Sequence, residues 1–348
     1  MSICDLRSDT VTKPTPAMRR AMSRAAVGDD VFGEDPTVRE LEELAAGTLG
    51  QEAALFVPSG TMGNLLAVMV HAEDGEVLFG DSSHIRLNEA GGHARVAGSP
   101  GWPLATDRFG RFSPDEVAGS VHGGNIHNAR TRLLCLENTH NFCGGTVVSA
   151  KDTEAIVRPA RKAGLKLHLD GARIFNAAAA LAVPARKLAA PFDSVMFCLS
   201  KGLCAPVGSM LCGSREFVAE ARAQRKLIGG AMRQAGVLAA CGIIAIREMA
   251  GRLGEDHANA RELAECLAEL PGVRLDMDTV QTNMVIFGYS GPRGRDARWL
   301  QRELESRGVR ALVLPVGGEP RIRLVTHHDV GRADCRRSVG ILRRLLAD

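Results

Sequence analysis

The alternation of strand-like and helix-like segments limits the fold of this chain more than any other feature of its sequence. Short apolar runs, each long enough for one strand, are separated by segments long enough for a helix. Strands are predicted at residues 76–79, 131–136, 166–170, 194–199 and 209–212, after an apolar run at 54–58. Strands separated by helices favour a mainly parallel sheet with helices on both faces. We therefore predict an α/β fold with its ligand site at the carboxyl ends of the strands.

Two helices in this part carry recognisable start signals. The first covers residues 37–49, where Pro36 precedes Thr37 and Glu40 in the spacing of a capping box. The second covers residues 63–71 and follows a Ser-Gly-Thr turn at residues 59–61. Both predicted helices belong to the alternation of helix-like and strand-like segments.

The pattern changes near residue 251, which predicts a second unit. An amphipathic helix at 253–270 ends at Pro271 and Gly272, and another helix is predicted at 295–307. Short strands are predicted at 274–276, 284–287, 310–314 and 321–325, and a last helix follows Asp329. We predict a large domain at residues 1–251, including the N-terminal segment, and a small α+β domain at 252–348. Without a flexible linker, the two should pack tightly.

Composition excludes several classes of function. The 348 residues carry a net charge of only +3 without long runs of like charge, which argues against nucleic-acid binding. No stretch of about 18 apolar residues predicts a membrane span, and the N-terminus lacks the apolar core of a signal peptide. Nine cysteines without a C-x-x-C pair suggest reduced thiols in a cytoplasmic protein.

A metal site is not expected. Cys135, His140 and Cys143 lie close in sequence, but their spacing matches no structural zinc pattern and a fourth ligand is missing. Buried, reduced thiols explain these cysteines more simply.

Chemically active groups follow three of the predicted strands. Lys201 closely follows an apolar strand, where poor solvation favours its neutral, nucleophilic amine. Asp170 ends the strand at 166–170, and Gly60 and Thr61 open the helix after the first apolar run. A pyridoxal-phosphate (PLP) enzyme needs these parts: a lysine that binds the cofactor covalently, a carboxylate for the pyridine nitrogen, and a helix N-terminus for the phosphate.

Each of these motifs has a simpler interpretation when taken alone. A lysine after a strand is more often a surface residue, Asp-Gly is more often a turn, and Ser-Gly-Thr before a helix is a common cap. Their occurrence in sequence, each at the end of its own strand, favours the PLP interpretation.

Specific motifs across nearly the whole chain extend this pattern. They are DLRSDTVT at 5–12, GDDVFGEDPT at 28–37, PSGTMGN at 58–64, ENTHN at 137–141, HLDGARIFN at 168–176, LSKGL at 199–203, PVGS at 206–209, GG at 229–230, MRQAG at 232–236 and RLVTH at 323–327. With these motifs the chain resembles the low-specificity L-threonine aldolases, which have the aspartate-aminotransferase-like fold type I of PLP enzymes.

The resemblance implies which residues hold the cofactor. Lys201 should bind PLP covalently, Asp170 should hydrogen-bond the pyridine nitrogen, and the backbone amides of Gly60 and Thr61 should hold the phosphate. His84 should stack on the ring. The family pattern also places Arg173 and Ser200 next to the cofactor.

The resemblance also implies a substrate site. Ser8, Arg173 and Arg323 should bind the α-carboxylate, for which the arginine fork is suited. His84, His127 or a water held between them should accept the proton of the β-hydroxyl group. Asn88 should lie beside the substrate side chain.

Three further residues are expected to come from a neighbouring subunit of a homotetramer with shared active sites. They are Phe32, Lys226 and Arg233. For Lys226 and Arg233 a solvated basic helix face is an equally simple interpretation. The only other expected partner is a small-molecule substrate.

The implied reaction is the retro-aldol cleavage of L-threonine, L-allo-threonine and related β-hydroxy-α-amino acids to glycine and an aldehyde. A β-eliminating lyase or an amino-acid racemase on the same scaffold is the alternative enzyme, because function depends on the site. A non-catalytic scaffold is disfavoured, since it would not need Lys201, Asp170, Arg173 and Arg323.

The chain departs from the family pattern at three positions. Phe32 stands where tyrosine is usual, Asn88 where an aromatic residue is usual, and Cys204 where glycine is usual. The first two leave the preferred substrate open, while the residues expected to hold the cofactor are unchanged.

Overall fold

A seven-stranded sheet forms the centre of the larger part of the molecule. The computed structural model describes residues 3–123, 125–316 and 318–346. The strand order is β2-β8-β7-β6-β5-β3-β4, and every pair is parallel except the two that involve β8. The strands are β2 (Ala53–Val57), β3 (Glu76–Gly80), β4 (Gly101–Leu104), β5 (Thr131–Glu137), β6 (Lys166–Asp170), β7 (Ser194–Cys198) and β8 (Ser209–Gly213). The predicted mainly parallel sheet is confirmed.

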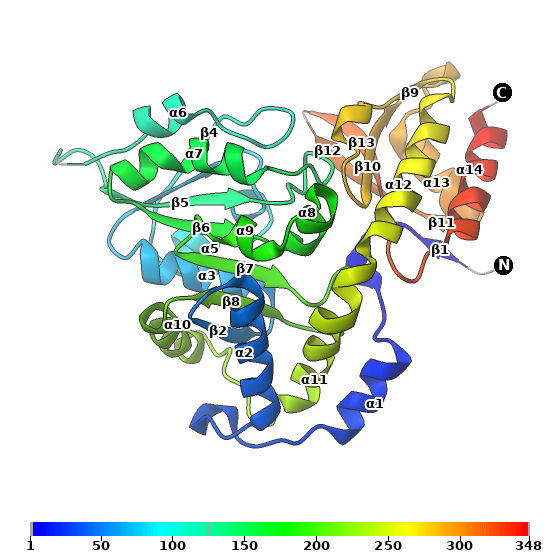
Figure 1. Ribbon diagram of the computed structural model, residues 1–348. Coiled ribbons are helices and arrows are strands. Elements are labelled where there is room, and N and C mark those ends of the chain that lie inside the picture. Colours follow the sequence, from blue (N-terminus) through cyan, green and yellow to red (C-terminus); the bar gives the residue numbers. More distant parts are fainter. Residues whose placement is uncertain (1–2, 124, 317, 347–348) are drawn as a thin grey trace.

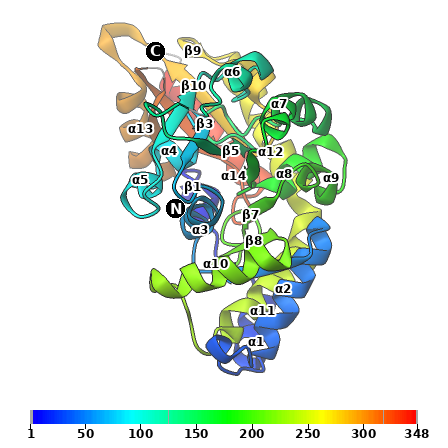
Figure 2. The ribbon, with the colours of Figure 1, turned by 90° about the vertical axis from the view of Figure 1, so that its left-hand side faces the viewer.

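Helices cover both faces of this sheet (Figures 1 and 2). Strand β2 shows why: Leu55 and Val57 pack with the side chains beneath α3 and α10, whereas Ala54 and Phe56 pack on the opposite side with α2. Alternate residues of a strand point to opposite faces, so both faces of these strands need apolar residues. The helices of this part are α2 (Pro36–Leu49), α3 (Gly60–His71), α4 (His84–Leu87), α5 (Gly92–Arg95), α6 (Pro114–Gly119), α7 (Ala150–Lys162), α8 (Ile174–Leu181), α9 (Ala185–Ala189) and α10 (Arg215–Leu227).

The predicted capping box at Thr37 and Glu40 is wrong. Helix α2 begins one residue earlier, and Asp35 is its N-cap, whose carboxylate accepts hydrogen bonds from the backbone nitrogens of Thr37 and Val38 at 3.1 and 3.0 Å. The Thr37 hydroxyl instead donates to the carbonyl oxygen of Ala26 at 2.7 Å. The proline at the first helical position fits Asp35 as the cap.

The C-terminal part contains a second, four-stranded antiparallel sheet. Its order is β12-β13-β10-β9, with β9 (Val273–Arg274), β10 (Met284–Tyr289), β12 (Leu312–Val316) and β13 (Glu319–Val325). Helices α12 (Leu253–Ala268), α13 (Ala297–Ser306) and α14 (Arg332–Leu346) pack around it. The predicted strand at 310–314 is in fact two strands, because Ala311 separates β11 (Val309–Arg310) from β12. Each of them pairs with a different partner.

The N-terminal segment packs against the C-terminal part. Strand β1 (Cys4–Asp5) pairs in parallel with β11, and Cys4 and Leu6 belong to the apolar cluster around α12, α13 and α14. The chain then passes through α1 (Pro16–Arg24) into the larger part (Figure 1). Helix α11 (Gly236–Ile244) packs against α1 and α2 and leads toward α12. Residues 6–12 therefore lie where the two parts of the molecule meet.

Two further findings concern the described residues. None of their helices has the length and apolar character needed to cross a membrane. Cys204 has a φ of 65°, in the left-handed region that disfavours a side chain. That backbone conformation accounts for glycine being usual at this position.

Candidate active site

Two adjoining cavities lie at the carboxyl edge of the large sheet. The outer cavity, about 630 Å³, is lined by residues of both parts of the molecule, including Ser8, Arg173 and Arg323. The inner cavity, about 160 Å³, lies between the start of α3 and the ends of β6 and β7. His84 and Lys201 line both cavities. They therefore mark the border between an inner and an outer compartment of one site.

Lys201 is held in place by its backbone. It follows β7 by three residues, and its carbonyl oxygen accepts hydrogen bonds from Oγ1 of Thr12 and the nitrogen of Cys204, both at 2.9 Å. The half-buried side chain lines both cavities. A primary amine at this border can reach a ligand in either compartment.

Asp170 lies in the wall of the inner cavity. It is the last residue of β6 and its side chain is buried. Oδ1 accepts a hydrogen bond from the nitrogen of Ala172 at 3.1 Å, and Oδ2 accepts one from Nδ2 of Asn64 at 2.9 Å. A carboxylate fixed in this way can accept a further bond from a cationic ring nitrogen.

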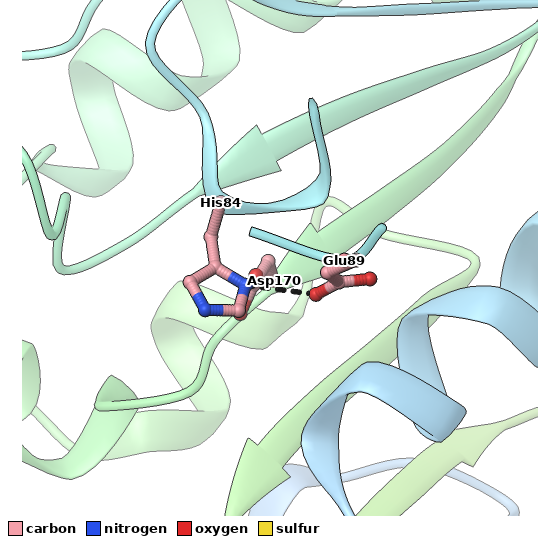
Figure 3. Close-up of side chains that lie close together, drawn as sticks. All are labelled: His84, Glu89 and Asp170. Atoms are coloured by element: carbon pink, nitrogen blue, oxygen red, sulfur yellow. Dashed lines mark hydrogen bonds and ion pairs between the residues drawn. The ribbon is translucent and has the colours of Figure 1, made fainter. Parts of the chain in front are cut away.

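His84 and Glu89 form a pair next to Asp170, and Figure 3 shows the three side chains together. Nδ1 of His84 lies 2.8 Å from Oε1 of Glu89. Burial alone would lower the pKa of His84, but the Glu89 hydrogen bond and the charges of Asp170 and Glu137 outweigh it and raise this pKa. Burial also raises the pKa of Glu89, which His84 only partly offsets. Because acidic groups surround the imidazole, this cluster holds protons tightly.

The start of helix α3 forms the floor of the inner cavity. Ser59 caps the helix by accepting a hydrogen bond from the nitrogen of Met62 at 3.2 Å, so Gly60 and Thr61 stand in the first turn. A Cβ on Gly60 would lie 2.9 Å from Sγ of Cys198, which explains why glycine is needed at this approach to β7. Free backbone amides at a helix start bind phosphate well.

Arg173 is paired within the protein. Its Nε and Nη2 donate to the two carboxylate oxygens of Asp9, both at 2.7 Å, and both side chains are buried. Burial would raise the pKa of Asp9, but Arg173, Lys201 and Arg323 together hold it well below its usual range. Arg173 therefore lines the outer cavity, but its Nε and Nη2 already donate hydrogen bonds to Asp9.

Arg323 lacks such a partner. Only 6% of the residue is exposed, and its hydrogen bonds go to neutral oxygens, the amide oxygen of Asn141 at 3.0 Å and the carbonyl of Arg7 at 3.1 Å. No carboxylate of the described residues lies within ion-pair distance. Burial, and then the charge of Arg173, lower the pKa of Arg323 to about 10. The outer cavity thus has an uncompensated positive charge and suits a carboxylate ligand.

Most residues predicted for the site line these cavities. Gly60, Thr61, Asp170 and Ser200 line the inner one, and Ser8, Asn88, Arg173 and Arg323 line the outer one, with His84 and Lys201 shared between them. His127 lines neither cavity; it lies on an exposed loop between α6 and β5. Phe32, Lys226 and Arg233 are also exposed and away from both cavities.

Several polar residues of the site have no role in the sequence-based prediction. Asp9, Asn64 and Asn141 lie within motifs that carry the resemblance, and Glu89 lies outside them. The partners of Asp9, Asn64 and Asn141 are distant in sequence, such as Asp170 for Asn64, 106 residues away, whereas Glu89 pairs with His84 and also with Asn64. A loop glutamate or a helix asparagine has no local signal of such a contact.

The only arrangement of metal-ligating groups among the described residues is His84, Glu89 and Asp170, whose ligand atoms lie within 4.8 Å of one another. Cys135, His140 and Cys143 do not form one. In the His84 cluster, the oxygens that face one another already have hydrogen-bond partners. Oε1 of Glu89 pairs with His84 and with the Asn64 amide, and Oδ2 of Asp170 accepts from the same amide.

Comparison with known proteins shows the family of this chain. The model of the beta-eliminating lyase family matches residues 5–289. The chain is 45% identical to low-specificity L-threonine aldolase 1 of Arabidopsis thaliana, over 96% of this chain and 94% of that protein.

Solved structures are similar in fold. A Leishmania major threonine aldolase matches with a TM-score of 0.84 and 20% identity, over 99% of both chains. A structure of SPT with PLP internal aldimine matches with a TM-score of 0.78 and 17% identity, over 99% of this chain and 88% of that one. At such identities these two likenesses concern the fold alone.

Proposed function

Because this chain belongs to the beta-eliminating lyase family and to its low-specificity L-threonine aldolases, we propose that it is a PLP-dependent aldehyde-lyase. Its substrates are L-threonine, L-allo-threonine and related β-hydroxy-α-amino acids, which it cleaves to glycine and an aldehyde. One observation carries the proposal. The uncompensated charge of Arg323 and the imidazole of His84 border the same cavity, next to the amine of Lys201.

The inner cavity fits the cofactor. Lys201 would bind PLP covalently, the first turn of α3 at Gly60 and Thr61 would hold the phosphate, and Asp170 would accept a bond from the pyridine nitrogen. Ser200 and His84 would border the ring. When bound, PLP supplies an electron sink for the electron pair released at the substrate α-carbon.

Arg323 would bind the α-carboxylate of the substrate, which would supply the negative charge that this side chain lacks within the protein. Arg173, held by Asp9, would add positive potential, and Ser8 a hydroxyl group on the same wall. Fixing the carboxylate restricts rotation of the substrate, so the β-hydroxyl group reaches one defined side of the cavity.

His84 would accept the proton of the β-hydroxyl group. In the neutral imidazole with Nδ1–H donating to Glu89, Nε2 would carry a lone pair, and no described residue hydrogen-bonds to it. The negative charges around His84 raise its pKa, which favours uptake of a proton as the carbon–carbon bond breaks. His127 stays predicted as a second candidate for accepting this proton. Because its loop lines neither cavity of this chain, it would have to act in the active site of a neighbouring subunit.

We propose that the protein assembles as a homotetramer with shared active sites. Exposed apolar side chains support this: Phe32 is 73% exposed, Leu227, next to Lys226 in sequence, is 75% exposed, and Ile126, next to His127, is 96% exposed. The Asp30 nitrogen donates to the Arg233 carbonyl, which joins the segments around Phe32 and Arg233 into one surface. Sedimentation analysis tests the assembly.

We also propose a division into two domains and a cytoplasmic location. Separate apolar clusters support a division into residues 1–251 and 252–348. Strand β1 belongs to the first range but packs on the second cluster, and Leu253 belongs to the second range but packs in the first cluster. A cytoplasmic location is supported by nine free cysteines.

A product assay tests the proposed reaction. The purified protein, saturated with PLP, is incubated with L-threonine, L-allo-threonine and bulkier β-hydroxy-α-amino acids. We expect glycine and the matching aldehyde in equal amounts. Formation of 2-oxobutanoate and ammonia from threonine would indicate β-elimination instead, and D-threonine or D-allo-threonine as the main product would indicate racemisation.

Replacing Asp170 by asparagine should slow carbon–carbon cleavage far more than it weakens cofactor binding. The phosphate contacts and Lys201 remain, but a neutral amide does not stabilise a protonated pyridine nitrogen. Single-turnover kinetics, together with a titration of PLP binding, separate the two effects. A cleavage rate close to that of the wild type would show that Asp170 does not have this role.

Replacing Asn88 by tyrosine should shift substrate preference toward threonine. Asn88 is exposed and lines the outer cavity, leaving room for larger side chains. Because one methylene of contact changes discrimination by only about 1–3 kcal/mol, wild type should not strongly prefer threonine. The kcat/KM values over the substrate panel check this; an unchanged ranking in Asn88→Tyr would remove Asn88 from the substrate wall.

A further inference from the structure

A chain of hydrogen bonds, buried except for its half-buried first bond, runs from the far end of α3 to the two carboxylates of the inner cavity. Asn64 and His71 stand two turns apart on α3, so both face the sheet. Nε2 of His71 lies 3.0 Å from Oγ of Ser194, which lies 2.8 Å from Nδ1 of His168. Nε2 of His168 lies 3.0 Å from Oδ1 of Asn64. Three neighbouring elements, α3, β6 and β7, therefore share one polar path.

The end of this path fixes the orientation of the Asn64 amide. Nδ2 of Asn64 lies 2.8 Å from Oε1 of Glu89 and 2.9 Å from Oδ2 of Asp170. A carboxylate only accepts hydrogen bonds, and the amide nitrogen has two hydrogens to donate. The reverse orientation would set the amide oxygen against two carboxylates at once. The amide nitrogen must therefore face Glu89 and Asp170, and the amide oxygen must face His168.

This orientation in turn fixes the proton of His168. The Asn64 oxygen needs a donor, so His168 must carry its proton on Nε2. Burial lowers the pKa of His168 to about 3, so the ring is neutral and Nδ1 is an acceptor. The hydroxyl of Ser194 then donates to Nδ1 and accepts from Nε2 of His71. Every bond of the path donates in the same direction, toward Glu89 and Asp170.

We propose that Asn64 and His168 are positioning residues that hold the carboxylates of Glu89 and Asp170 side by side as acceptors, one for His84 and the other for the cofactor. Without the Asn64 amide, two carboxylates of one buried cluster would repel each other and turn apart. His168 acts one step further away, because its Nε2–H keeps the amide from rotating. The inference rests on the proposed function, since it assumes that Asp170 faces PLP.

Three substitutions at His168 separate this role from simple packing. The amide nitrogen of glutamine can take the place of Nε2, whereas the shorter asparagine reaches only the place of Nδ1, and leucine fills similar space without a donor. We expect PLP to dissociate about tenfold more readily from His168→Asn and His168→Leu than from wild type, because bonds to charged groups are weakened. His168→Gln should recover most of the PLP affinity. Asn64→Leu should be affected at least as strongly as His168→Leu.

The dissociation constant of PLP and the visible spectrum of the bound cofactor are measured for each variant, beside its melting temperature. If leucine and glutamine at His168 gave equal PLP affinity and only the smaller asparagine differed, packing alone would explain the residue and the proposal would be overturned. Equal affinity in all variants would overturn it as well.

Selective ¹⁵N labelling of histidine tests the proton positions directly in the wild-type holoenzyme. We expect the His168 ring proton on Nε2, and a proton on Nδ1 alone would contradict the proposal. This result does not depend on the reaction. An inactive wild-type protein with the expected tautomer would count against the proposed function and not against the role of His168.

Discussion

Replacing Lys201 by alanine is expected to remove turnover of every β-hydroxy-α-amino acid. The amine is the only group at the border of the two cavities that can bind PLP covalently, and the half-buried side chain has no second lysine beside it among the described residues that line either cavity. The phosphate site on α3 and Asp170 remain, so PLP should still bind, but non-covalently and with a changed absorption spectrum.

Lys187→Ala is the matched control, since Lys187 is exposed on α9 and touches neither cavity. It should retain wild-type activity and spectrum. The measurement is the initial rate of aldehyde release together with the visible spectrum after PLP addition. Substantial turnover by Lys201→Ala would contradict the assignment, whatever the spectrum.

Replacing Arg323 by alanine is expected to give the second largest loss. Removing one partner of a buried charge pair costs about 2–5 kcal/mol, so kcat/KM should fall by roughly 30-fold to several thousandfold. Arg323→Lys should fall in between, because lysine keeps the charge but not the planar fork. The free protein should tolerate Arg323→Ala, since the substitution removes an uncompensated buried charge.

Arg321→Ala is the control for this position, because Arg321 lies two residues earlier on β13 and is exposed. We expect it to leave kcat/KM near the wild-type value. The panel should include an amine without the α-carboxylate, which Arg323→Ala and wild type should handle equally poorly. If Arg323→Ala lost no more than Arg321→Ala, the carboxylate would bind elsewhere.

The sequence predicts much of the sheet and the residues that end its strands. Lys201 and Asp170 are predictable because parallel strands bring their carboxyl ends to one edge, so polar residues that follow separate apolar runs are expected to meet there. Strand bounds are also close, since each strand is a short apolar run between helices. Arg323 rests on the family resemblance alone.

The residues that support the site are less predictable, because their contacts depend on long-range packing. Asp9 pairs with Arg173 across 164 residues, and it lies in a short segment that joins the two parts of the molecule. Glu89 stands in a polar loop sequence that gives no sign of burial. The shift of the α2 cap from Thr37 to Asp35 has a local cause, since two residues near Pro36 compete for the same role.

The proposed function depends most on Lys201 as the residue that binds the cofactor. The measurement that tests this directly is reduction of the PLP-saturated wild-type protein with borohydride, which makes the covalent link permanent, followed by peptide mass spectrometry. We expect one pyridoxyl group per chain, on the peptide that contains Lys201. A pyridoxyl group on any other lysine, or none in a protein that releases aldehyde, would contradict the assignment.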